Sequence, residues 1–148
     1  MQLPFSDIIA LGITSETESI LIINVYNPCD KPILSELFNH LREHIHQQNY
    51  HIIIMAGDFN CHHPLWNPRE YIVHDEEADT LVEMAAELGL NLMIPAGTVT
   101  YPNGGTEGTA IDLVWGNDEA VYRLLKCHIA EDHDHGSDHL PIETVLTI

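Results

Sequence analysis

The residues best suited to chemistry lie together, directly after an apolar stretch at residues 51–56. The chain continues Gly-Asp-Phe-Asn-Cys-His-His from position 57, which places Asp58, Asn60, His62 and His63 close together. A carboxylate, an amide and two imidazoles can orient water, move a proton or hold a metal ion. Burying such groups without partners is costly, so we expect a reaction or a ligand at this strand end.

Two further polar positions stand out against apolar surroundings. Asp112 lies inside the run Ala-Ile-Asp-Leu-Val-Trp at 110–115, and Asp138 and His139 precede the last apolar stretch. Because carboxylates are almost never fully buried unless they are paired, Asp112 needs a partner. We expect His139, since a carboxylate can fix an imidazole's tautomer and raise its basicity. The alternative for an acid that follows a strand, such as Asp58, is a turn or cap residue.

The charge of the chain is strongly acidic. There are 23 Asp and Glu residues against 5 Lys and Arg, a net charge of −18 with the 11 histidines neutral. A protein that binds nucleic acid through phosphates normally uses Lys and Arg. Any phosphate chemistry here therefore requires a bound cation or a basic neighbour.

Length and composition indicate one globular domain over residues 1–148, with 45% hydrophobic residues. No apolar run approaches the ~20 residues of a membrane span, and the first residues lack a secretion-signal pattern. We expect an intracellular protein, nuclear or cytoplasmic, that is neither secreted nor membrane-bound. Cys29, Cys61 and Cys127 are few and widely spaced, which favours reduced thiols over disulfides or a cysteine zinc site.

The elements that must position these residues are a mixture of strands and helices. Strands are expected at 8–13, 20–26, 51–56, 91–94, 98–101, 110–115 and 142–148, a helical turn at 118–125, and a polar loop at 60–75. A helix begins near Asp30 or Pro32 and another near Asp75, which ends at Gly89. Their apolar faces carry Ile33, Leu34, Leu37, Leu41 and Ile45, and Ala78, Leu81, Val82, Ala85 and Leu88. Hairpins and crossovers together predict an α/β or α+β fold with a mixed sheet.

Four blocks in this order resemble the endonuclease/exonuclease/phosphatase superfamily of metal-dependent phosphoesterases. They are Ile-Asn-Val-Tyr-Asn-Pro at 23–28, Gly-Asp-Phe-Asn at 57–60, Ile-Asp-Leu-Val-Trp at 111–115 and Gly-Ser-Asp-His-Leu-Pro-Ile at 136–142. Within the superfamily, the chain is most similar to the apurinic-type endonuclease domains of non-LTR retrotransposons. The resemblance runs from about residue 8 to the end and implies a β-sandwich flanked by helices, a truncated four-layer DNase-like fold.

The resemblance implies a role for each matching catalytic residue. Asp58 would orient and deprotonate the attacking water, and Asn60 would hold a phosphate oxygen and help to fix that acid. His139 would contact the scissile phosphate as base or stabiliser. Asp112 would pair with that histidine, and Tyr26 would contact the phosphate.

Metal and substrate contacts are implied in the same way. Asp138, Asp58 and Asn60 would hold Mg²⁺ or Mn²⁺, which neutralises the charge that develops on phosphate oxygens. His62, His63 and Trp66 would lie at the rim of the cleft, near a nucleic-acid substrate, with DNA the expected one. A second interpretation of the histidine pair is that the two imidazoles are transition-metal ligands.

The chain departs from the family pattern at its start. Two family blocks, one with an Asn and one with a metal-binding Glu, have no counterpart; Glu16 and Glu18 lie in a turn, which is the wrong context. We expect strands to be missing from the sandwich and the metal site to be weakened. A second copy of the chain, forming a homodimer, or the Glu-Asp-His-Asp-His loop at 131–135 could compensate; the alternative for that loop is a solvated acidic segment.

Three functions remain open from the sequence. The first is divalent-metal-dependent phosphodiester hydrolysis of the endonuclease type. The second is a copy without turnover that serves as a binding or assembly module, favoured by the absent Glu block and the charge. The third is a phosphatase of small phosphate esters, which suits an acidic surface.

Overall fold

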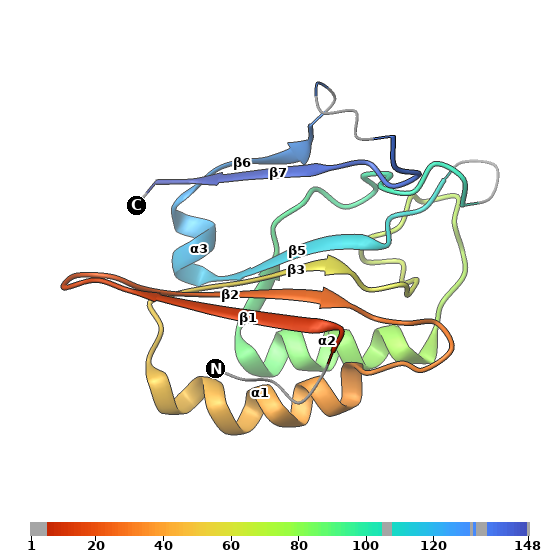
Figure 1. The fold of residues 1–148 in the computed structure, drawn as a ribbon. Coiled ribbons are helices and arrows are strands. Elements are labelled where there is room, and N and C mark those ends of the chain that lie inside the picture. The colour runs from red at the N-terminus through yellow and green to blue at the C-terminus, as the bar shows by residue number, and fades with distance from the viewer. Residues whose placement is uncertain (1–5, 105–107, 131, 133–135, 148) are drawn as a thin grey trace.

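A computed structural model describes residues 6–104, 108–130, 132 and 136–147. The elements are β1 (Ile8–Thr14), β2 (Ser19–Tyr26), α1 (Leu34–Gln48), β3 (Ile52–Asp58), α2 (Glu76–Leu88), β4 (Leu90–Leu92), β5 (Asp112–Asn117), α3 (Asp118–Tyr122), β6 (Leu124–Ile129) and β7 (Ile142–Leu146). Seen from the side, α1 and α2 form a lower layer, a sheet the middle layer, and β6 with β7 the upper layer (Figure 1). The expected mixed α/β fold, with a mixed sheet flanked by helices, is confirmed.

The middle layer is a mixed sheet with the strand order β1-β2-β3-β5-β4. β2 and β3 are parallel, and the other neighbouring pairs are antiparallel. The parallel pair is joined by the crossover through α1, as the sequence pattern requires. As a result, β2 and β3 end at the same edge of the sheet, on the right in Figure 1.

The two long helices cover one face of this sheet. All five predicted apolar residues of the first helix segment are buried, and α2 buries Ala78, Leu81, Met84, Ala85 and Leu88. Gly89 ends α2 in the left-handed region with φ 64°, as its position predicted. Helix α1 begins at Leu34, shortly after Pro32, and Ile33 occupies its cap position.

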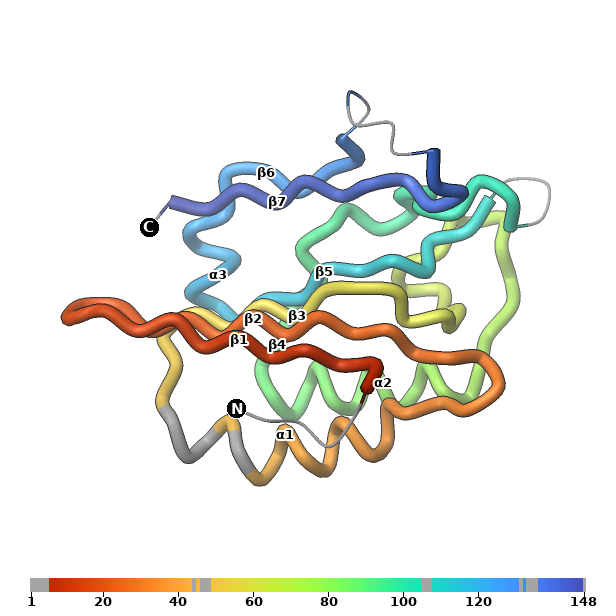
Figure 2. The backbone as a smooth tube through the Cα atoms, viewed as in Figure 1, coloured from red at the N-terminus to blue at the C-terminus, as the bar shows by residue number. Residues whose placement is uncertain are grey.

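Smaller corrections concern the second half of the chain. Residues 98–101 form no strand; only Tyr101 makes an isolated bridge, with Thr109. The expected helical turn at 118–125 is shorter, because α3 ends at Tyr122 and β6 begins at Leu124. The tube in Figure 2 shows the long connection from β3 to α2 at the edge where β2 and β3 end.

The cysteines are free, as expected: Cys29 is exposed, and Cys61 and Cys127 are buried. Burial, and secondarily nearby acids, raise the pKa of the Cys61 thiol far above its ordinary value. A thiol that stays protonated is a poor nucleophile, so Cys61 contributes packing. Among the described residues, no helix is long and apolar enough to cross a membrane.

Candidate active site

Three of the predicted side chains share one row across the sheet. Tyr26 at the end of β2 pairs with Asp58 at the end of β3, and Asp58 pairs with Asp112 at the start of β5. Residues directly opposite each other in a sheet project to the same face. Tyr26, Asp58 and Asp112 therefore project from the same edge of the sheet, on the face that is turned away from the helices.

His139 reaches this row from the loop before β7. Its Nδ1 lies 2.9 Å and 3.1 Å from the two carboxylate oxygens of Asp112. Nδ1 is thus the donor to Asp112, and Nε2 is left for a substrate. Burial lowers the pKa of His139, but the hydrogen bond and charge of Asp112, and then the charges of Asp58 and Asp138, raise it above its ordinary value. The expected Asp112–His139 pair is present.

Thr100, which was not among the predicted site residues, forms hydrogen bonds to the backbone beside both members of this pair. Its buried hydroxyl accepts hydrogen bonds from the backbone N–H groups of Ile111 and Asp112, at 3.1 Å and 3.0 Å. Its carbonyl accepts one from the N–H of Leu140, next to His139, at 2.7 Å. One threonine thereby fixes the start of β5 against the histidine loop. The neighbouring Tyr101 ring packs on the His139 ring, with centroids 4.9 Å apart.

A tight turn after β3 presents Asp58. Asn60 lies in the left-handed region with φ 47°. From there, its backbone N–H donates to one Asp58 oxygen at 3.0 Å and its side-chain amide donates to the other at 3.2 Å. Gly57 has φ 143°, and a Cβ at that position would lie 1.9 Å from the carbonyl oxygen of Val25. Glycine is therefore required for β2 and β3 to approach beside Asp58.

Asn27 braces the same turn from the end of β2, where its place before Pro28 indicated only the end of a strand. The side chain is buried, with 2% of its surface exposed. The side-chain amide of Asn27 donates to the Phe59 carbonyl at 2.9 Å, and the backbone carbonyl of Asn27 accepts from the Asn60 side-chain amide at 3.0 Å. The orientation of Asp58 and Asn60 thus depends on Asn27.

The site combines two acids and an imidazole at short range. Ligand atoms of Asp58, Asp112 and His139 all lie within 4.8 Å of one another. Burial first, and then the charge of Asp112, raise the pKa of Asp58, although the Asn60 N–H and His139 oppose the shift. Two neighbouring carboxylates repel each other and are stabilised by a hard cation, for which oxygen ligands are suited. The donor set fits Mg²⁺ or Mn²⁺, with Asp58 and Asp112 as its two carboxylates.

The other predicted ligands occupy different positions. Asp138 is exposed and lies outside the group of three, although its charge acts on His139. Tyr26 is 48% exposed and is available to a ligand. The roles of Asp138 and Tyr26 therefore stay predictions. Of the loop at 131–135, only Asp132 is among the described residues, so the predicted metal role of that loop lies outside them.

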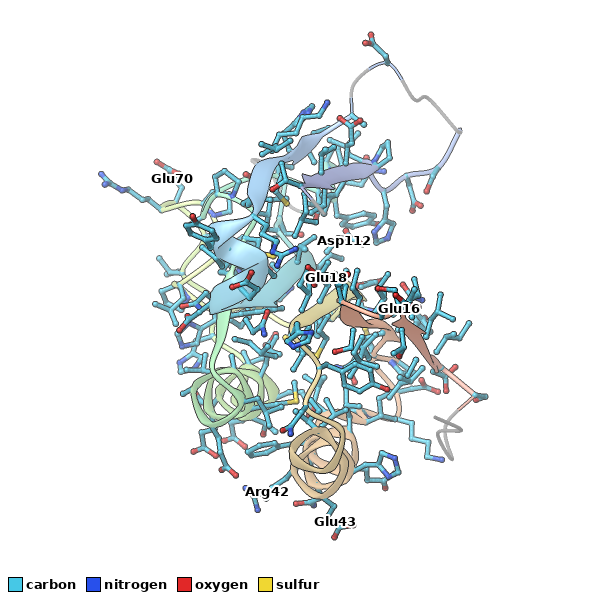
Figure 3. The ribbon with its side chains drawn as sticks, turned by 90° about the vertical axis from the view of Figure 1, so that its left-hand side faces the viewer. Glu16, Glu18, Arg42, Glu43, Glu70 and Asp112 are labelled. Atoms are coloured by element: carbon cyan, nitrogen blue, oxygen red, sulfur yellow. The ribbon has the colours of Figure 1, made fainter. Side chains whose placement is uncertain are left out.

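A cavity of about 570 Å³ opens beside the pair. Its lining includes Asp112 and His139 together with apolar residues of β3, β5 and β7. In the view along the sheet, Asp112 lies between the middle layer and the β6–β7 layer (Figure 3). The site therefore has polar groups at the mouth of a largely apolar cleft, the usual form of a ligand-binding cavity.

His62 is held at the start of the polar loop. Its backbone N–H donates to Asp75 at 2.8 Å, its Nδ1 lies 3.4 Å from the Asn67 amide nitrogen, and its ring packs on Tyr71. Burial lowers the pKa of His62, which Asp75 partly opposes. A neutral imidazole at neutral pH offers a hydrogen bond and no charge to a phosphate.

His63 belongs to a second group, with His74 and Asp79, whose ligand atoms also lie within 4.8 Å of one another. The Leu65 N–H, however, donates to His63 Nδ1 at 3.1 Å. Neutral His63 then carries its proton on Nε2, which makes that nitrogen a donor and not a metal ligand. This geometry disfavours the transition-metal interpretation of the histidine pair.

The prediction that Trp66 lies at the cleft rim is wrong. Its side chain is 1% exposed, and its indole N–H donates to the Cys61 carbonyl at 3.1 Å. The ring also packs edge-on against Trp115, with centroids 6.0 Å apart. Trp66 is buried because it anchors the long polar loop to the core, and it cannot contact a substrate there.

The fold of this chain is similar to the folds of several solved structures. The endonuclease domain of TRAS1, a telomere-specific non-LTR retrotransposon, matches 96% of this chain with a TM-score of 0.75 and 22% identity. A 3′-5′ exonuclease from Neisseria meningitidis matches 93% with a TM-score of 0.65 and 17% identity. An AP endonuclease from Archaeoglobus fulgidus matches 87% with a TM-score of 0.58 and 18% identity. The chain spans 64%, 64% and 62% of those chains, less than two thirds of each.

Sequence comparison decides the family. No curated protein matches the chain. The family model described as endonuclease-reverse transcriptase matches residues 20–143, which include Tyr26, Asp58, Asp112 and His139. The chain therefore belongs to the endonuclease-reverse transcriptase family, within the endonuclease/exonuclease/phosphatase superfamily.

Proposed function

We propose that the chain is a divalent-metal-dependent phosphodiesterase of the endonuclease type, with DNA as its substrate. The observation that carries the proposal is the convergence of Asp58, Asp112 and His139 within 4.8 Å beside a cleft. The names of the similar structures, which include a retrotransposon endonuclease and an exonuclease, support the same chemistry.

Each side chain has one task in this proposal. Asp58, fixed by two hydrogen bonds from Asn60, accepts a proton from the attacking water. His139 uses Nε2 to donate to a phosphate oxygen, because Asp112 holds its Nδ1 and favours the protonated ring. Such positioned acid, base and donor groups each contribute about 10²–10⁴ in rate. Tyr26, at the open end of the row, contacts the phosphate.

Asp58 and Asp112 are the carboxylates that would hold the metal ion, joined in our proposal by Asn60 and Asp138. Bound Mg²⁺ or Mn²⁺ would neutralise charge on the phosphate oxygens. Among the described residues, the group within 4.8 Å holds only these two carboxylates, and Asp138 lies outside it. We therefore expect the metal ion to bind weakly, because few carboxylates contact it directly.

A phosphatase of small esters is the second candidate. The net charge of −18 opposes the approach of a long polyanion, whereas a small metal-bound ester carries little charge to repel. Salt separates the two, because binding to DNA through phosphates weakens steeply with salt concentration.

The test is hydrolysis of plasmid DNA, a folded RNA and para-nitrophenyl phosphate, a small phosphate monoester, with Mg²⁺, Mn²⁺ or EDTA. His139→Gln and His128→Gln form a matched pair, since His128 is an exposed histidine on β6. Metal-dependent plasmid cleavage that only His139→Gln abolishes supports the proposal. Cleavage of the small ester alone favours the phosphatase. If no substrate is cleaved with either metal, the chain is a binding or assembly module.

A further inference from the structure

Most of the basic side chains are already neutralised by acids. The chain has 5 Lys and Arg residues against 23 Asp and Glu residues. Three of the five form ion pairs within the described part of the chain: Arg42 with Glu87, Arg123 with both Glu18 and Glu119, and Lys126 with Glu143. A cation that a carboxylate already holds has little charge left to attract a phosphate.

Lys31 and Arg69 are the two basic side chains that remain. Both are exposed, and no ion pair joins either of them to an acid among the described residues. Lys31 lies in the loop from β2 to α1, and Arg69 lies in the loop from β3 to α2. Because β2 and β3 are parallel, both loops leave the edge of the sheet that carries Tyr26 and Asp58 (Figure 1). The two unpaired cations therefore border the candidate active site.

A buried asparagine holds the first of these loops against the site. The side-chain oxygen of Asn27 accepts a hydrogen bond from the Ile33 N–H at 2.8 Å, which closes the loop that contains Lys31. The Asn27 amide donates to the carbonyl of Phe59, the residue after Asp58, at 2.9 Å. Lys31 is thus carried by a short loop that is fixed to the Asp58 turn.

A second buried asparagine holds the other loop. The side-chain oxygen of Asn67, a residue that is 4% exposed, accepts a hydrogen bond from the Ala110 N–H at 3.1 Å, two residues before Asp112. Arg69 follows Asn67 by two residues, so the backbone that carries it is tied to the start of β5. Both cations are therefore presented by loops that hydrogen bonds join to the site residues.

This distribution of charge suits a substrate that continues past the scissile phosphate. The net charge of −18 repels DNA at long range, so attraction must come from cations placed where the strand passes. Contacts of Lys and Arg with phosphates supply essentially all of the sequence-independent affinity for DNA. A small phosphate ester ends at the metal site and gains nothing from either loop. Two unpaired cations at this edge therefore favour a nucleic acid over a small ester.

We propose that Lys31 and Arg69 bind the DNA phosphates that flank the scissile one. The proposal rests on the phosphodiesterase function proposed above, and it deepens that function by assigning the contacts that select a polynucleotide. The scissile phosphate itself is left to Asp58, Asp112 and His139 with the metal ion. Lys31 and Arg69 act on binding and take no part in bond cleavage.

The test is binding of a fluorescent DNA duplex, measured by anisotropy over a range of salt concentrations. EDTA is present, so that metal-dependent cleavage does not alter the probe. Lys31→Gln and Arg69→Gln each remove one positive charge. Lys126→Gln and Arg42→Gln are the matched controls, because they remove the same charges from side chains that acids already hold. Lys31→Arg and Arg69→Lys keep the charge and should bind as the wild-type chain does.

We expect Lys31→Gln and Arg69→Gln each to lower the slope of log affinity against log salt by about 0.9, the contribution of one phosphate contact. Their deficit in affinity should then shrink by about threefold between about 50 mM and 200 mM salt. The two control variants should keep the wild-type slope.

An unchanged slope in both test variants, an equal change in the controls, or no binding by the wild-type chain at low salt would overturn the proposal. The readout is separate from hydrolysis. If the slopes change as expected while no substrate is cleaved with either metal, the proposed function fails and the assignment of Lys31 and Arg69 as phosphate contacts stands.

Discussion

Replacement of Asn27 by alanine tests whether one buried amide holds the catalytic turn. Two side-chain hydrogen bonds would be lost. The Asn27 amide nitrogen donates one to the Phe59 carbonyl at 2.9 Å, and the Asn27 side-chain oxygen accepts the other from the Ile33 N–H at 2.8 Å. The backbone bonds of Asn27 to Asp58 and Asn60 would lose their support. The substitution therefore affects the start of α1 and the Asp58 turn together.

The magnitude follows from the two groups left without partners. A buried backbone group that loses its hydrogen bond costs about 1–3 kcal/mol, so the two groups together should lower the free energy of unfolding of Asn27→Ala by about 2–6 kcal/mol. Domains of this kind have about 5–15 kcal/mol in total, so a loss in the middle of the first range leaves the variant folded. Hydrolysis should fall by more than stability explains, because Asp58 is no longer held.

The assay is urea denaturation, in which the dependence of the free energy of unfolding on urea concentration should stay the same in both variants. Amide hydrogen exchange at Phe59 and Asn60 provides the local measurement. Asn24→Ala is the control, because Asn24 is exposed on the same strand and has no hydrogen bond among the described side chains. It should change stability by less than about 0.5 kcal/mol. The reasoning is refuted if the two variants have the same urea midpoint and exchange rates.

Three other changes have defined outcomes. Gly57→Ala should destabilise far more than Gly89→Ala in urea melts, because its Cβ would lie 1.9 Å from the Val25 carbonyl oxygen, whereas at Gly89 nothing lies within 4 Å. Trp66→Ala should lower the free energy of unfolding by about 3–5 kcal/mol, because it removes a large core side chain, whereas Leu65→Ala, at an exposed position, should change it little. A changed KM with unchanged stability would contradict the burial of Trp66. Asp58→Asn should raise the Tm at pH 7 yet lower hydrolysis by about 10²–10⁴. The folded state raises the pKa of Asp58 above its ordinary 3.8, so this group favours folding only below that pH and loses its contribution as pH rises through the folded value. The gain in Tm should therefore vanish at low pH. A gain that persists there would contradict a raised pKa of Asp58 in the folded state.

The parts of the fold and site that follow from local pattern were predictable. The stripe from Ile33 to Ile45 and the stop at Gly89 are properties of one helix each, and both appear in the structure. The Asp112–His139 pair followed from the cost of burying a lone carboxylate, which leaves few possible partners.

The parts that depend on distant backbone groups were not predictable. Thr100 acts through N–H groups of residues 111 and 112 and of Leu140, and no sequence pattern encodes those contacts. Trp66 was misplaced because a tryptophan after two histidines suits a substrate rim and a loop anchor equally well. Only the hydrogen bond to Cys61 and the burial of the ring distinguish the two.

The most direct test of the central claim is plasmid nicking in Mg²⁺ and Mn²⁺ by the wild-type chain, Asp58→Asn and Glu83→Gln. Glu83 is exposed on α2, and its replacement removes the same unit of charge away from the site. We predict EDTA-sensitive nicking that Asp58→Asn lowers by about 10²–10⁴ and Glu83→Gln leaves unchanged. Equal nicking by all three proteins would show that the row of Tyr26, Asp58 and Asp112 is not the active site.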